Sequence, residues 1–201
     1  MASDAQVPTG NTLDKYATSN PVERRMMAGF FAAFDALVDR AAPARVVEVG
    51  AGEGEVAGRL RRRFPGLPLT LLDLPDPELQ SQWISADLPG VVGSGTHLPF
   101  PDAAADLVLA IEVLEHVADP AQVLRELVRV SSGYLLVSVP REPVWRVGNM
   151  LRGRYLSELG NTPGHVQHWS RRGFVREVAR VADVVEVRSP LPWTMVLART
   201  G

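Results

Sequence analysis

An apolar strand that runs directly into a glycine-rich turn is the feature that most constrains this chain. Residues 46–49 read Val-Val-Glu-Val, residues 50–54 read Gly-Ala-Gly-Glu-Gly, and a polar helical run extends from Glu53 to Phe64. The glycines at 50, 52 and 54 allow positive φ and close approach of the backbone to a ligand. Such a strand, turn and helix place a helix N-terminus at the turn, which is the architecture of a nucleotide site.

The turn departs from the dinucleotide-binding fingerprint. Its third glycine follows the second by two positions rather than three, so GAGEG stands where GxGxxG is expected. Glu48 and Glu53 flank the turn, and in a partly buried site they would repel a pyrophosphate and attract a cation. Taken alone, the same residues also suit a plain turn whose acids complement a helix dipole.

The alternation of strand and helix patterns predicts an α/β fold, a doubly wound, Rossmann-like sheet of about seven strands with helices on both faces. Most strands should be parallel, with an antiparallel closing strand formed within residues 182–199. Prolines interrupt the pattern between residues 75 and 95, where 81–86 and 90–92 both suit a strand, and we prefer Val91–Val92. The remaining expected elements are helices at 21–40, 53–64, 120–130 and 171–181, and strands ending at Val49 and spanning 67–74, 106–111, 134–139, 182–188 and 193–199.

The length of 201 residues fits one domain, which we expect at 21–201 after a flexible N-terminal segment, residues 1–20. Tyr16 in that segment is a candidate lid over the cofactor, or else a surface tyrosine of a loose terminus. No apolar run flanked by positive charge marks a signal peptide or membrane anchor, so a cytoplasmic protein is the expectation.

Charge and cysteine content narrow the possible partners. The formal net charge is −2, from 21 basic and 23 acidic residues, so no global field draws the chain to nucleic acid or to an anionic membrane. The chain has no cysteine, which excludes disulfides, thiol nucleophiles and cysteine-ligated metals.

Asp73 ends the second predicted strand, 21 residues after Gly52. An acid at this place in a nucleotide-binding βαβ unit bonds the ribose hydroxyls. The alternative is a turn-forming aspartate before Pro75. The spacing favours ribose, so the glycine turn and Asp73 both point to a nucleoside.

Three further segments carry a family resemblance. They read Leu-Pro-Phe-Pro-Asp at 98–102, Asp-Leu-Val at 106–108 and Glu-Val-Leu-Glu-His-Val at 112–117. Together with the glycine turn, the chain from about Arg45 to its C-terminus resembles the class I S-adenosylmethionine-dependent methyltransferases of type 11, which act on small molecules. The resemblance implies S-adenosylmethionine as cofactor and a small-molecule acceptor, with no nucleic acid and no membrane as partner.

The resemblance also implies roles for individual residues. In this family an aspartate commonly receives the adenine amino group at the position held here by Ser94, which accepts a hydrogen bond but carries no charge. Asp87 is displaced in register from that position. The resemblance assigns Glu48 to the methionine ammonium, Gly50, Ala51 and Gly52 to the turn beneath the cofactor, Asp73 and Leu74 to the ribose, Ser94, Gly95 and Thr96 to the adenine, and Ile111 and Glu112 to the border of the methyl donor.

Methyl transfer from a sulfonium depends largely on orienting donor and acceptor, and only some acceptors need a base. The candidate catalytic bases are His116, His165 and His168, because a neutral imidazole accepts a proton near pH 7. His116 alternatively shapes the start of a helix, and His165 and His168 alternatively bond to backbone in a loop that Ser170 ends as a helix cap. No acid or cysteine stands beside the two later histidines in sequence, so we predict no metal site.

The region at about 141–170 is expected to cap the acceptor pocket. Its cationic and aromatic residues suit an anionic or sugar-bearing acceptor, although arginines on a surface helix are usually just solvated. Two rival functions stay open: an NAD(P)-binding oxidoreductase and a non-catalytic nucleoside-binding protein with the same fold. The residues of the predicted cap are Arg141, Trp145, Arg146, Asn149, Arg152, Arg154 and Tyr155.

Overall fold

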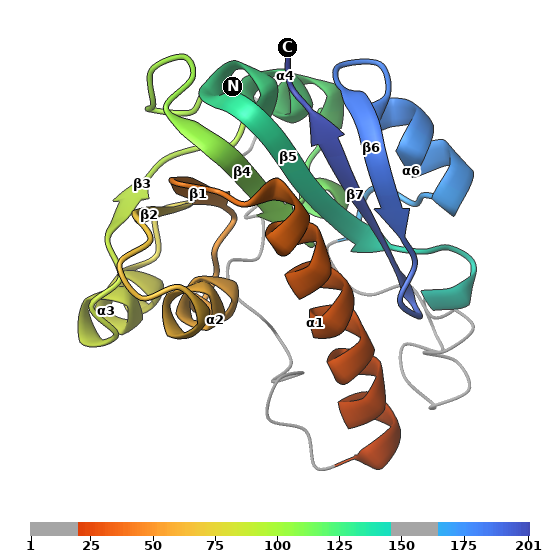
Figure 1. Ribbon diagram of the computed structural model, residues 1–201, viewed down its shortest axis with the longest axis horizontal. Coiled ribbons are helices and arrows are strands. Elements are labelled where there is room, and N and C mark those ends of the chain that lie inside the picture. The colour runs from red at the N-terminus through yellow and green to blue at the C-terminus, as the bar shows by residue number, and fades with distance from the viewer. Residues whose placement is uncertain (1–19, 146–164) are drawn as a thin grey trace, which may run out of the picture.

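The computed structural model describes residues 20–145 and 165–201, and these form a seven-stranded sheet with helices on both sides (Figure 1). The strand order is β3-β2-β1-β4-β5-β7-β6. β7 pairs antiparallel with β5 and β6, whereas the other neighbouring pairs are parallel. The predicted doubly wound sheet with one antiparallel strand is therefore confirmed. The strands are β1 (Val46–Val49), β2 (Leu69–Asp73), β3 (Gly90–Val92), β4 (Ala105–Ile111), β5 (Ser131–Pro140), β6 (Asp183–Arg188) and β7 (Trp193–Arg199).

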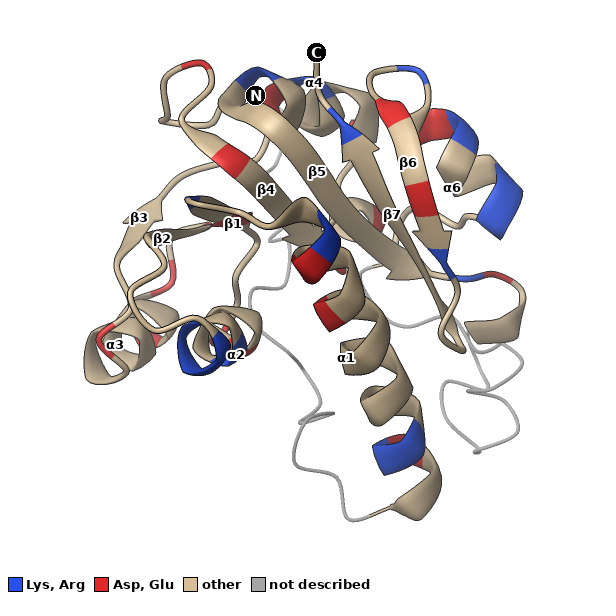
Figure 2. Cartoon of the chain, in the orientation of Figure 1, with Lys and Arg blue, Asp and Glu red and all other residues tan. Residues whose placement is uncertain are grey.

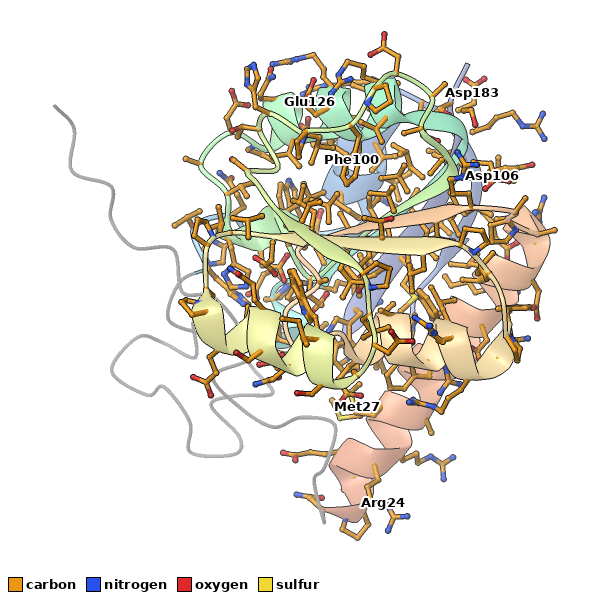
Figure 3. All side chains as sticks on the ribbon, turned by 90° about the vertical axis from the view of Figure 1, so that its left-hand side faces the viewer. Arg24, Met27, Phe100, Asp106, Glu126 and Asp183 are labelled. Atoms are coloured by element: carbon orange, nitrogen blue, oxygen red, sulfur yellow. The ribbon has the colours of Figure 1, made fainter. Side chains whose placement is uncertain are left out.

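The helices divide between the two faces of the sheet. Figure 3 views the sheet along its plane, with α1, α2 and α3 below it and the helix that carries Glu126 above it. The helices are α1 (Pro21–Ala41), α2 (Glu55–Arg63), α3 (Pro77–Ser85), the 3-10 helix η1 (Leu114–His116), α4 (Pro120–Val130) and α6 (Arg171–Val178). No helix within residues 20–145 and 165–201 is long and apolar enough to cross a membrane.

Alternating strand residues build one apolar core on each face. Leu107 and Leu109 of β4 pack with Phe34 of α1, while Val108 and Ala110 of the same strand pack in the core that includes Leu124 of α4. Because successive side chains of a strand point to opposite faces of the sheet, a continuous apolar segment contributes side chains to both cores. This explains why residues 107–111 read as an unbroken apolar run.

Short polar side chains begin several helices. Asn20 accepts a hydrogen bond from the Val22 amide at the start of α1, and Asp119 accepts one from the Gln122 amide at the start of α4. In both helices a proline follows the cap at the first helical position, where its missing N–H costs nothing. The predicted starts of these two helices are confirmed.

The region that the prolines obscured is a helix followed by a strand. Asp76 accepts hydrogen bonds from the amides of Glu78 and Leu79, and Pro77 opens α3. Residues 81–85 are therefore helical, so a strand at 81–86 is wrong, whereas the preferred strand at Val91–Val92 is confirmed. The signal was present in the sequence, because an aspartate before a proline is a helix start as well as a turn.

Parts of two predicted segments lie outside the described residues. They are residues 1–19, which include Tyr16, and residues 146–164, which include Arg146, Asn149, Arg152, Arg154 and Tyr155 of the expected cap.

A charged network ties the loop before β4 to α4. Glu126 accepts from the Leu98 amide at 2.8 Å and from Arg129, whose guanidinium also donates to Asp102 and to the carbonyl oxygens of Leu98 and Phe100. These bonds, led by the one from Arg129, lower the pKa of Glu126 from its ordinary 4.5 to about 2. The segment at 98–102 is thus held by α4.

We expect Glu126→Gln to lower the free energy of unfolding at pH 7 by about 1 to 2 kcal/mol, because Arg129 loses one of its charged partners and keeps Asp102. A lowered native pKa stabilises the fold above pH 4.5, and this contribution is lost as the pH falls towards 2. Urea unfolding at pH 7 and at pH 3 should therefore show a smaller difference from the wild type at the lower pH.

The matched control is Glu177→Gln, which breaks the i,i+3 pair between Glu177 and the exposed Arg180. It should cost less than about 0.5 kcal/mol, as surface pairs do. Equal effects of the two substitutions would contradict the role of the network.

Candidate functional site

Acidic residues converge where three neighbouring parallel strands approach their carboxyl ends. Glu48 lies in β1, Asp73 ends β2 and Glu112 directly follows β4. β1 pairs with both β2 and β4, so the three acids come from adjacent strands. Ligands of open α/β sheets bind at this edge, beside the switch in strand order.

Asp73 links the glycine turn to the second strand. One carboxylate oxygen accepts from the Gly52 amide and the other from the Leu74 amide, each at 2.7 Å. Burial raises the pKa of Asp73, while the two amide bonds oppose that shift. A carboxylate has about four acceptor positions, so two stay available for hydroxyl donors.

The turn itself needs glycine for two different reasons. At Gly50, with φ of 71°, an added Cβ would lie 2.3 Å from a Val113 methyl carbon. At Gly52, with φ of 51°, the added Cβ would meet no heavy atom within 4 Å, so the strain there is in the backbone. Gly52 thus presents backbone to open space, as close approach of a ligand requires. Ala51 lies buried between the two glycines.

Trp83 supports this turn from α3. Its indole Nε1 donates to the Gly52 carbonyl oxygen at 2.7 Å, and the side chain is buried. Sequence reasoning missed Trp83 because it did not identify α3. The signal was its spacing of four from Leu79, which places both residues on the buried side of a helix.

Glu48 is a buried acid beneath the turn, with 2% of its surface exposed. Its carboxylate interacts with the Ala57 amide in the first turn of α2, and its Oε2 has no hydrogen-bond partner among the residues described. Burial, followed by repulsion from Asp73, raises the pKa of Glu48 to about 8. A cation at this edge would favour the charged form of Glu48.

Residues 94–96 form a tight turn after β3. The hydroxyl groups of Ser94 and Thr96 lie 2.9 Å apart, and Gln122 of α4 donates to the Thr96 carbonyl oxygen. Gly95 lies against Val49 of β1 and Val123 of α4, which puts this turn at the same edge as the acids. Asp87 instead precedes β3, where its exposed side chain pairs with Arg61.

Glu112 has unusual backbone geometry, and two side chains from the described part of the chain bond its carboxylate. Its φ is 59°, although it is not a glycine. Trp193 at the start of β7 donates to one carboxylate oxygen at 2.7 Å, and Ser138 of β5 donates to the other at 3.2 Å. Ile111, buried at the end of β4, precedes it. Trp193 is a second residue that sequence reasoning missed, because only β-sheet pairing brings it beside Glu112.

Two of the three predicted catalytic histidines meet. The rings of His116 and His165 have centroids 4.8 Å apart in an edge-to-face arrangement. Trp145 stacks on His165 and also contacts Trp193. His168 is exposed and lies outside the cluster that Glu115 forms with His116 and His165.

Comparison with known proteins identifies relatives of this chain. Residues 47–137 match a family model described as a methyltransferase domain. A probable S-adenosylmethionine-dependent methyltransferase of Mycolicibacterium smegmatis is 32% identical over 123 residues, which cover 57% of this chain and 45% of that protein. An uncharacterized methyltransferase of Mycobacterium sp. (strain JLS) is 39% identical over 88 residues, 43% of this chain and 34% of that protein.

Among solved structures, magnesium protoporphyrin IX methyltransferase of Synechocystis PCC 6803, with bound SAH, superposes with a TM-score of 0.67. It is 13% identical, and the match covers 92% of this chain and 89% of that one, so it supports the fold alone. The chain spans less than half the length of the two curated relatives named above.

The buried Glu48 should make stability depend on pH. Because its native pKa is raised, the unfolded chain releases this proton first, and stability is lost as the pH rises from about 4.5 towards 8. We expect Glu48→Gln to remove this contribution, which amounts to at most about 1.4 kcal/mol per pH unit. Urea unfolding between pH 5 and pH 8.5 measures it.

The control is Glu55→Gln, at an exposed position in the first turn of α2. Its unfolding free energy should follow the wild type across the whole pH range. If Glu48→Gln follows the wild type as well, the carboxyl of Glu48 is not protonated in the native protein.

Proposed function

This chain belongs to the class I S-adenosylmethionine-dependent methyltransferases of type 11, and we propose that it transfers the sulfonium methyl group to a small-molecule acceptor. The observation that carries this proposal is that two acids, Glu48 and Asp73, lie on adjacent parallel strands beside an open glycine turn. Their chemistry fits this cofactor, which has cationic groups at its methionine end and hydroxyls on its ribose.

Glu48 and Asp73 fit different parts of the cofactor. The Oε2 of Glu48, which has no hydrogen-bond partner within residues 20–145 and 165–201, supports an interaction with the methionine ammonium, since a buried carboxyl gains most from a nearby cation. Asp73 uses one acceptor position on each oxygen for the backbone and keeps others for ribose hydroxyls. Leu74 shares this end of β2, and residues 94–96 supply hydroxyl and backbone groups for the adenine.

Glu112 and its neighbours would surround the reacting methyl group. The bound cofactor supplies an electrophilic methyl on its sulfonium. Trp193 and Ser138 fix the carboxylate of Glu112, while Trp145 and Trp193 add aromatic surface that excludes water and attracts a cation. Such a site accelerates transfer by orienting donor and acceptor.

The distribution of charge supports a small acceptor. Figure 2 shows basic and acidic residues intermingled along α1 and α6, whereas a nucleic-acid site gathers basic residues on one face. His116 and His165 lie side by side and are the candidate bases, and a base is needed only where the acceptor atom carries a proton. In this proposal the segment at 141–170 caps the acceptor pocket, as the sequence predicts.

Calorimetry with S-adenosylhomocysteine tests the cofactor site. Asp73→Ala should weaken binding by roughly 100-fold, about 2.7 kcal/mol, because it removes ribose bonds and the support of Gly52. Gly52→Val should also weaken binding, through backbone strain at positive φ.

Asp87→Ala is the matched control, because this aspartate is exposed and lies before β3 rather than after a strand. Its affinity should equal that of the wild type. Unchanged affinity in Asp73→Ala would contradict the assignment, and thermal stabilisation by NADH but not by S-adenosylhomocysteine would favour an oxidoreductase.

Turnover distinguishes an enzyme from a binding protein of the same fold. We expect release of S-adenosylhomocysteine when the protein and S-adenosylmethionine are mixed with a panel of hydroxylated, amine-bearing and carbon-nucleophile acceptors. His168→Ala should bind the cofactor normally and lose turnover only if that exposed histidine contacts the acceptor. Cofactor binding without methylation of any acceptor would favour the non-catalytic alternative.

A further inference from the structure

Three side chains with metal-binding atoms meet beside the proposed acceptor site. They are Glu115 and His116 of η1 and His165, which lies far along the chain before α6. One ligand atom from each lies within 4.8 Å of those from the other two. The missing acid beside His165 in sequence is thus supplied by the fold.

Backbone hydrogen bonds hold the two segments in register. The amides of Val166 and Gln167 both donate to the Glu115 carbonyl oxygen, at 2.8 and 3.1 Å. The Gln167 side chain also donates to the Val117 carbonyl oxygen, 50 positions earlier in the chain. These bonds set His165 opposite Glu115 and His116 independently of any ligand.

The cluster is largely withdrawn from water. Glu115 is 1% exposed and His165 is 9% exposed. Burying a carboxylate is costly unless cationic or hydrogen-bonding groups compensate its charge. A divalent cation shared with two imidazoles is one group that can compensate this charge, and it would bind all three ligand atoms.

We propose that Glu115, His116 and His165 form a site for a divalent transition-metal cation such as Zn²⁺. Two imidazole nitrogens and one carboxylate oxygen suit a borderline cation, whereas Mg²⁺ and Ca²⁺ prefer oxygen ligands. Tetrahedral bonds of about 2.0 to 2.2 Å set ligand atoms roughly 3.4 Å apart, so modest side-chain movement closes the site. Three protein ligands leave at least one coordination position open.

The open coordination position can bind an atom of the acceptor. This part of the proposal rests on the proposed methyl transfer. Contacts run from His165 through Trp145 to Trp193, which donates to Glu112. The metal site is therefore connected to the place where the methyl group would lie. A cation there would hold and orient an oxygen of the acceptor, so the substrate class is an oxygen-bearing small molecule, such as one with a hydroxyl beside a carbonyl or second hydroxyl.

Zinc calorimetry on the full chain, freed of metal by a chelator, tests the site. We expect one Zn²⁺ per chain, and at least about 100-fold weaker binding in His165→Ala and in Glu115→Gln, since each loses a ligand. His168→Ala is the control and should bind zinc as the wild type does. The visible absorption of bound Co²⁺ provides a second readout for variants that remain folded by circular dichroism.

The outcomes separate this site from the cofactor site. Absence of zinc uptake by the wild type, or wild-type affinity in His165→Ala, overturns the metal site while S-adenosylhomocysteine binding stands. Weaker zinc binding in His165→Ala and Glu115→Gln, with wild-type zinc binding in His168→Ala, supports the metal site. For an acceptor that proves active, loss of turnover on chelation and its recovery with Zn²⁺ support acceptor coordination, and unchanged turnover overturns that step.

Discussion

The hydrogen bonds from Gly52 and Leu74 to Asp73 hold the proposed cofactor site together. Asp73 ends β2, and through these bonds it fixes a turn that belongs to β1 and α2. Trp83 also supports this turn, because its indole N–H donates to the Gly52 carbonyl oxygen. The peptide groups of Gly52 are therefore fixed before any ligand arrives, which reduces the ordering cost of binding.

The proposed cofactor side and the proposed acceptor side of the site are held by different interactions. Around Glu48 and Asp73, burial raises both pKa values, and repulsion from Asp73 adds to the rise at Glu48, so a cationic ligand would favour the charged forms. Around Glu112, hydrogen bonds from the Trp193 indole and the Ser138 hydroxyl fix the carboxylate. Trp193 belongs to β7, so the antiparallel strand that lies between β5 and β6 also contributes to the proposed acceptor side.

Much of the fold was predictable because its signals are local. Apolar runs predicted the buried strands, the Asn20-Pro21 pair predicted the start of α1, and the apolar spacing within residues 120–130 predicted α4. The same chemistry at Asp76-Pro77 was missed, since three prolines close together also suit an irregular loop. Because that helix was not predicted, the role of Trp83 was not predicted either, although its indole supports the glycine turn.

The sequence by itself determined the strand, glycine turn and terminal acid, because glycine geometry, strand periodicity and the spacing of Asp73 act over short stretches of chain. It also determined the family, through motifs in nearby segments. Only the tertiary structure decided that Glu115 and His116 face His165, and that Trp193 holds Glu112. These contacts depend on which strands are neighbours and on the register between segments that are distant in sequence. That register is set by hydrogen bonds that form only when the sheet has formed.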